Sequence, residues 1–134
     1  MNGYVLIADD NVDARQIFAE AAESMGLVVE TTGDGTAALA LARQKPPALL
    51  LLDVMMPGLN GLQVLSRLRT DPTTRNVPVL IISASAFGSV DPARLPGNTR
   101  VMQKASYNLA ELIKVIGQMI GMEEWADEGL PAAS

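Results

Sequence analysis

The apolar residues of this chain are concentrated in short runs, separated by stretches in which they recur at helical spacing. Five runs have the length and composition of buried strands, namely Tyr4–Ala8, Leu27–Thr31, Leu49–Leu52, Val77–Ile82 and Val101–Met102. Four stretches predict helices: Asn11 or Asp13 to Ser24 or Met25, Thr36–Gln44, Gly61–Thr70, and Ser106 or Asn108 to about Ile120. Strands that alternate with helices favour an α/β fold with a doubly wound, five-stranded parallel sheet covered on both faces.

The helical spacing also predicts which side chains face the core. Ile17 and Phe18 are expected on the inner face of the first helix, and Leu109 and Leu112 on the inner face of the last one.

Two segments depart from the regular alternation. Proline and glycine interrupt residues 83–99, so we expect an irregular or short fourth helix there, at most between Phe87 and Leu95. Residues 122–134 are acidic and then rich in proline and alanine, which is typical of a tail or a linker stub. The expected organisation is one domain over residues 1–121, followed by this segment.

Composition removes several classes of function. The chain has 134 residues and a net charge of −5, which argues against a nucleic-acid or anionic membrane partner. It contains no cysteine and no histidine, so disulfides, thiolate or imidazole metal sites and histidine catalysis within this chain are excluded. No apolar run is long enough for a membrane span, and the N-terminus does not resemble a signal peptide. We therefore expect a cytoplasmic location.

Five polar residues follow the predicted strands at their carboxyl ends. Asp9 and Asp10 follow the first strand, Asp53 the third, Ser83 the fourth and Lys104 the fifth. Because parallel strands all end on the same edge of a sheet, we expect these side chains to lie close together. Three neighbouring carboxylates need a cation, and oxygen ligands without histidine or cysteine suit Mg²⁺. Two carboxylates and a backbone carbonyl are sufficient protein ligands for this ion.

The same edge carries groups that suit a small tetrahedral anion. Lys104 supplies a positive charge, Ser83 a hydroxyl, and the backbone amides of Met55 and Ala84 further donors. Asp53, placed beside Mg²⁺ and lysine, could attack phosphorus and form an aspartyl phosphate. Each residue alone is commonplace at a strand end, and it is their joint placement that indicates this chemistry.

Over about residues 3–121 the sequence resembles the receiver domain of two-component response regulators, with a chemotaxis-regulator-like fold. The motifs are Ile7-Ala8-Asp9-Asp10-Asn11, Asp34-Gly35 with Ala38-Leu39, Leu52-Asp53-Val54-Met55-Met56-Pro57-Gly58 with Asn60-Gly61, Ser83-Ala84, and Lys104. The resemblance implies a flavodoxin-like sheet in the order 2-1-3-4-5. It also implies that Asp53 takes a phosphoryl group from a histidine kinase or a histidine phosphotransfer domain, as a signalling phosphoacceptor and not a turnover enzyme.

The resemblance further implies a role for each site residue. Asp10, Asp53 and the Met55 carbonyl would bind Mg²⁺ directly, and Asp9 would bind it through water. Ser83 would be the switch hydroxyl and Lys104 the salt-bridge partner of the phosphoryl group.

Three features depart from the family pattern. Ala105 stands where proline is usual, Val101 stands where an aromatic switch residue is usual, and residues 85–99 replace a regular helix. They favour one alternative, a protein-interaction receiver that works without phosphorylation. A second alternative is a Mg²⁺-dependent phosphohydrolase with an aspartyl nucleophile. It is disfavoured because such enzymes usually carry a general acid/base two residues after the nucleophile, and Met55 occupies that position. A downstream effector and a homodimer formed through the last helix remain open.

Overall fold

The protein forms a five-stranded parallel sheet with helices on both faces. The computed structural model describes residues 3–84, 95, 97–104 and 108–121. The described strands and helices are β1 (Tyr4–Ala8), α1 (Val12–Glu23), β2 (Val28–Thr32), α2 (Gly35–Gln44), β3 (Leu49–Asp53), α3 (Gly61–Thr70), β4 (Val79–Ser83), β5 (Thr99–Gln103) and α4 (Leu109–Ile120). The sheet order is β2-β1-β3-β4-β5, and all four strand pairs are parallel. The expected fold class and strand order are confirmed.

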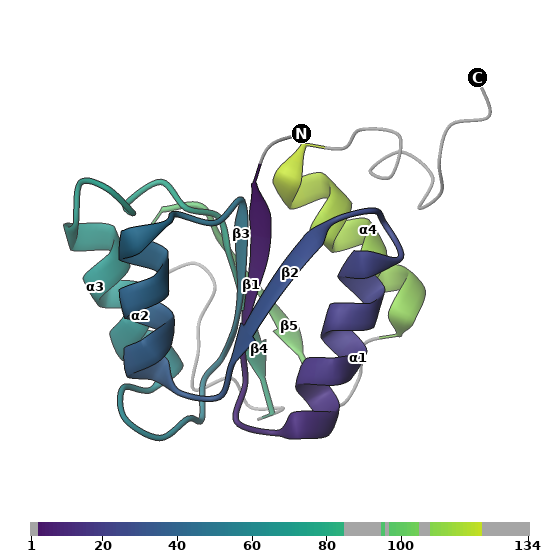
Figure 1. Cartoon of the computed structure of the whole chain (residues 1–134), viewed down its shortest axis with the longest axis horizontal. Coiled ribbons are helices and arrows are strands. Elements are labelled where there is room, and N and C mark those ends of the chain that lie inside the picture. Colours follow the sequence, from purple (N-terminus) through teal and green to yellow (C-terminus); the bar gives the residue numbers. More distant parts are fainter. Residues whose placement is uncertain (1–2, 85–94, 96, 105–107, 122–134) are drawn as a thin grey trace.

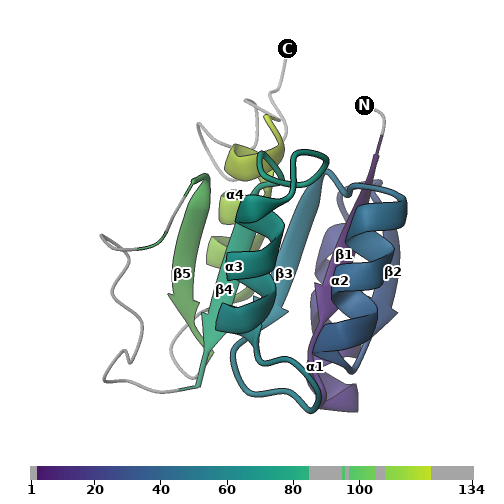
Figure 2. The ribbon, with the colours of Figure 1, turned by 90° about the vertical axis from the view of Figure 1, so that its left-hand side faces the viewer.

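Two aliphatic clusters separate the sheet from its helices. In Figure 1, α2 and α3 cover one face of the sheet, and α1 and α4 cover the other. Figure 2, turned by 90°, shows α2 and α3 in front of the strands. Alternate residues of each strand enter opposite clusters, as the pleat requires: Leu50 and Leu52 face α2 and α3, whereas Leu49 and Leu51 face α1 and α4. The central strands are therefore buried on both faces, which explains their continuous apolar runs.

Helix boundaries follow local capping chemistry. Side chains of Asn11, Asp34, Asn60 and Asn108 cap the four described helices, each accepting a hydrogen bond from an amide three residues later. Asn60 and Gln63 form a reciprocal capping box. Consequently the α3 boundaries agree with the prediction, and the other helix starts lie within a residue or so of it.

Two side chains that were expected to face the core do not. Ile17 on α1 is 46% exposed and Leu109, the first residue of α4, is 52% exposed. Both positions fit an apolar helical stripe, but no described element lies over them. Phe18 and Leu112, the other two side chains named for these helices, are buried as expected.

Three predictions fall on residues that the structure does not describe. They are the short fourth helix at 87–95, of which only Leu95 is described, the tail at 122–134, and Ser106 as one of the two alternative caps of the last helix. In the part of the chain that the structure describes, no helix combines the length and apolar character needed to cross a bilayer.

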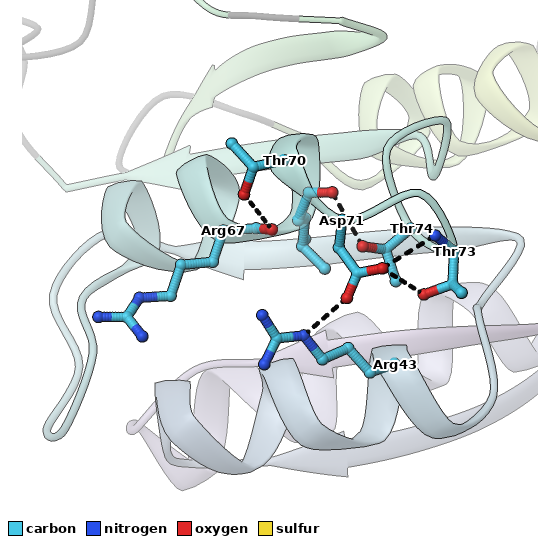
Figure 3. Close-up of polar contacts among 7 residues, drawn as sticks. Arg43, Arg67, Thr70, Asp71, Thr73 and Thr74 are labelled. Carbon is cyan, nitrogen blue, oxygen red and sulfur yellow. Dashed lines mark hydrogen bonds and ion pairs between the residues drawn. The ribbon is translucent and has the colours of Figure 1, made fainter.

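Polar contacts fix the end of the sheet opposite the strand carboxyl ends. Figure 3 shows Asp71, just after α3, accepting hydrogen bonds from Thr73 and from Nε of Arg43 on α2, the latter at 3.0 Å. The guanidinium of Arg69 donates to the carbonyls of Val77 and Asn98, at 2.7 and 3.0 Å. These contacts tie α2, α3 and the starts of β4 and β5 together.

Candidate functional site at the carboxyl edge of the sheet

The five polar residues identified in the sequence all lie at the carboxyl edge of the sheet. Figure 1 shows this edge at the lower end of the strands. Asp9 and Asp10 directly follow β1. Asp53 and Ser83 are the last residues of β3 and β4, and Lys104 directly follows β5. β1, β3, β4 and β5 are neighbours in the sheet, so the strand order brings the residues together.

Three carboxylates form a compact cluster at this edge. Asp9, Asp10 and Asp53 each offer an oxygen, and these oxygens all lie within 4.8 Å of one another. Asp9 and Asp53 are only 1% and 3% exposed, whereas Asp10 is exposed to solvent. Buried like charges at this separation repel one another, so the ionised cluster favours a bound cation.

Lys104 reaches into the cluster from the end of β5. Its Nζ lies 2.8 Å from Oδ2 of Asp9 and 3.6 Å from Oδ2 of Asp53. The backbone amide of Lys104 donates to the Ser83 carbonyl at 2.8 Å, which continues the β4–β5 pairing up to the site. Burial alone would lower the pKa of Lys104, but the hydrogen bond to Asp9 and the charges of both aspartates raise it above its ordinary value.

The carboxyl group of Asp53 is unusually basic. Its pKa is raised from 3.8 to about 6, mainly by burial, next by the neighbouring charge of Asp9, and with a smaller contribution from Asp10. The charge of Lys104 and a hydrogen bond from the Met55 amide act in the opposite direction. Above about pH 6 this side chain is therefore mainly an ionised carboxylate in a poorly solvated position.

Asp9 is held at four atoms. Its amide donates to the Thr32 carbonyl at 3.0 Å, and its Oδ1 accepts from the Asn11 amide at 2.9 Å. Its carbonyl accepts from Nη1 of Arg15 at 2.8 Å. Its buried Oδ2 forms the 2.8 Å ion pair with Lys104 and accepts no hydrogen bond from any other described residue. An anionic oxygen left in this state has spare capacity for a cation or a water molecule.

The residues present fit a hard divalent cation. The cluster offers only oxygen ligands, one of them the incompletely satisfied Oδ2 of Asp9. Carboxylate oxygens with room for water are the donor set that Mg²⁺ prefers.

Glycines set the loop that follows Asp53. A Cβ on Gly61 would lie 2.3 Å from the Asp53 carbonyl oxygen, and a Cβ on Gly35 would lie 1.8 Å from that of Leu59. The two ends of the loop over residues 54–60 are therefore close together, and its Leu59 backbone packs tightly against the first residue of α2. It carries Met55, whose amide bonds to the Asp53 carboxylate. Met55's side chain is 70% exposed and does not contribute to the core.

Sequence reasoning did not single out Arg15, and it quoted Gly35, Gly58 and Gly61 within the family motifs without giving them a structural role. Arg15 lies six residues after Asp9, far enough along α1 for its side chain to fold back over the turn. The pairs Gly33/Gly35 and Gly58/Gly61 mark two loops on the same sheet edge. Their spacing was visible in the sequence, but the close contacts that they permit join residues from different segments, which spacing alone does not predict.

Comparison with known proteins identifies the family. The family model of the response regulator receiver domain matches residues 5–115. The chain therefore belongs to the response regulator receiver domain family and is a module of two-component signalling.

Three relatives illustrate the range of this similarity. The response regulator PleD of Caulobacter vibrioides is 42% identical over 85 residues, which is 63% of this chain but only 18% of PleD. The polar-differentiation response regulator DivK of Brucella ovis is 28% identical over 121 residues, covering 90% of this chain and 98% of DivK. The receiver domain of the sensor histidine kinase PA1611 from Pseudomonas aeruginosa PAO1, solved with a magnesium ion in its active-site cleft, shares the fold. Its TM-score is 0.79 at 23% identity, covering 90% of this chain and 99% of that one.

Proposed function

We propose that this domain is a Mg²⁺-dependent phosphoacceptor, with Asp53 as the residue that is phosphorylated. The observation that supports it most directly is the placement of Asp53: a buried carboxylate between two other aspartates and the ammonium group of Lys104. A carboxylate that is poorly solvated and has a raised pKa is a better nucleophile than an ordinary surface aspartate.

The proposed reaction is an in-line phosphoryl transfer. An Oδ atom of Asp53 attacks the phosphorus of a phosphorylated donor, the new O–P bond forms, and the bond to the donor nitrogen breaks. The donor imidazole leaves with the electron pair of that bond. Lys104 faces the reacting carboxylate and would stabilise the equatorial oxygens, with the Ser83 hydroxyl and the amides of Met55 and Ala84 as further donors.

The acidic cluster is the proposed cation site. Asp10, Asp53 and the Met55 carbonyl would bind Mg²⁺ directly, and Asp9 would contact the ion through a bound water molecule. When bound, the ion would neutralise negative charge on the transferred group. Lys104 already pairs more closely with Asp9 than with Asp53, at 2.8 against 3.6 Å, so the ammonium can move towards a phosphoryl group without leaving the site.

The phosphoryl donor must be another protein or domain, because this chain has no histidine. We propose a histidine kinase or a histidine phosphotransfer domain, in keeping with the two-component family. The chain matches only 18% of PleD but 98% of DivK, so both multidomain and short relatives exist. We further propose that the receiver occupies residues 1–121 and that 122–134 are a tail or linker stub.

The direct test is intact mass after incubation with acetyl phosphate. We expect the mass of one phosphoryl group to be added with Mg²⁺ and no addition with a chelator. Asp53→Asn should remain unmodified. Asp13→Asn, an exposed aspartate at the start of α1, is the matched control and should behave as wild type. An unmodified wild-type mass, or equal labelling of the Asp53→Asn variant, would refute the proposal.

A second candidate function is a binding module that does not use phosphorylation. Val101 supports it: this β5 side chain is half-buried against the α2/α3 cluster, at the position where the family pattern leads one to expect an aromatic switch residue. This alternative expects no change in spectrum or oligomeric state when beryllofluoride is added to the Mg²⁺-loaded protein. The phosphoacceptor proposal expects such a change, together with labelling of Asp53.

A further inference from the structure

We propose that Arg15 is a positioning residue that fixes the Asp9–Asp10 turn for cation binding, and that Gly33 is glycine to leave room for it. The inference rests on the proposed cation site and adds two residues to it. Neither residue belongs to the acidic cluster. Both lie on elements beside it, Arg15 on α1 and Gly33 in the loop between β2 and α2.

The contact that carries the inference is from the side chain of Arg15 to the backbone of Asp9. Nη1 of the half-buried Arg15 donates to the Asp9 carbonyl at 2.8 Å. That carbonyl belongs to the peptide group that leads into Asp10. Because a peptide group is planar, holding its oxygen also holds the amide nitrogen of Asp10 and restricts the direction in which Asp10 leaves the strand.

Asp10 depends on this support more than its neighbours do. Asp9 and Asp53 are buried, and each is paired with Lys104. Asp10 is exposed, and no hydrogen bond or ion pair of its side chain has been found among the described residues. Its carboxylate must therefore be aimed by the backbone. A ligand held only through its backbone loses affinity when that backbone loosens, because the cation must then order it on binding.

Gly33 provides the space for the guanidinium. A Cβ built on Gly33 would lie 2.6 Å from Nη1 of Arg15 and 3.7 Å from Cα of Asp10. The backbone of Gly33 does not have the positive φ that would require glycine. The only close clash of a side chain at this position would be with the Arg15 guanidinium. The end of an arginine side chain can rotate away from such a clash. Gly33→Ala should therefore displace the guanidinium from the Asp9 carbonyl without unfolding the protein.

Two unrelated substitutions are thus expected to produce the same defect. Arg15→Met removes the donor, and Gly33→Ala displaces it. Arg15→Lys keeps a cationic donor on a different geometry and should recover part of the effect. Arg67→Met is the matched control, because Arg67 is exposed on α3 and Figure 3 shows its guanidinium extending away from the other side chains drawn.

The first measurement is made on the metal-free protein. The Asn11 amide, which donates to Oδ1 of Asp9 at 2.9 Å, reports the order of the turn. We expect its hydrogen exchange to be about tenfold faster in Arg15→Met and Gly33→Ala than in wild type, with amides of the central strands unchanged. The second measurement is Mg²⁺ affinity by calorimetry, which should weaken by about tenfold in both variants and less in Arg15→Lys.

Wild-type exchange at Asn11 together with wild-type Mg²⁺ affinity in both variants would overturn the inference. So would a defect in Arg15→Met that Gly33→Ala does not share, since the two should act through one contact. If Arg15→Met does not fold, Gly33→Ala decides the question alone. Failure of the wild-type protein to bind Mg²⁺ would instead refute the proposed function, while the exchange measurement would still test the contact.

Discussion

Replacing Asp53 by asparagine should change how the stability of the metal-free protein depends on pH. The pKa of the Asp53 carboxyl is raised to about 6 in the folded protein, first by burial and then by the charge of Asp9, from an ordinary value of 3.8. Between these two values the unfolded chain has lost the proton and the folded protein still holds it. The free energy of unfolding of the wild type therefore falls as pH rises through this window.

The size of this effect follows from the pKa difference. One pKa unit corresponds to about 1.4 kcal/mol, so ionisation of Asp53 should lower the wild-type free energy of unfolding by about 3 kcal/mol in total. Asparagine does not ionise and removes this pH-dependent term. The Asp53→Asn variant should therefore gain about 2–3 kcal/mol relative to wild type between about pH 4 and pH 7.5.

The assay is urea denaturation followed by circular dichroism, with a chelator present, for both proteins across this pH range. Asp13→Asn, which changes an exposed carboxyl, is the control and should keep a nearly constant difference from wild type. Adding Mg²⁺ at about pH 7.5 should then stabilise wild type more than Asp53→Asn, because the proposed cation site includes the ionised Asp53 carboxylate. A difference between wild type and Asp53→Asn that stays constant within about 0.5 kcal/mol across the range would refute this reasoning.

Three further substitutions test contacts that hold the fold around the site, each by urea denaturation at neutral pH. Arg69→Met removes the donors to the carbonyls that precede β4 and β5 and should cost about 2 kcal/mol. An unchanged midpoint would show that water replaces the guanidinium at no cost. Gly35→Ala should cost about 1–3 kcal/mol, because its Cβ would lie 1.8 Å from the Leu59 carbonyl oxygen. Stability equal to wild type would contradict the close approach of the two loops. Asn60→Ala breaks the capping box of α3 and should cost about 1 kcal/mol, and no loss would mean that the helix start is held by packing alone.

The candidate site residues could be found in the sequence because the parallel sheet follows from local patterns. Each strand ends at a polar residue, and alternation with helices makes the strands parallel, so Asp9, Asp53 and Lys104 had to meet at one edge. The geometry agrees: the three carboxylates offer oxygens within 4.8 Å, and Lys104 contacts two of them. Their roles in phosphoryl transfer remain proposals.

Element boundaries show where local pattern stops being sufficient. The apolar run suggested a fourth strand from Val77, but β4 begins at Val79, because the Val77 amide closes a turn onto Thr74. β5 extends over Thr99–Gln103, beyond its two apolar residues, since pairing with β4 sets its length. Strand ends depend on partners far away in the sequence, which an apolar pattern does not report.

The sequence by itself therefore determined the fold class, the sheet edge and the acidic, hydroxyl and ammonium groups on it. Only the tertiary structure decided that Ile17 and Leu109 are exposed, because burial depends on what lies over a helix face as well as on its periodicity. It also decided that the Arg15 guanidinium packs against Gly33, eighteen positions away in the sequence, since such contacts depend on the strand order and the path of the loops. The position of Asp53 at a strand end can be recognised from the local sequence, whereas the contacts around the acidic cluster come from segments far apart in the chain.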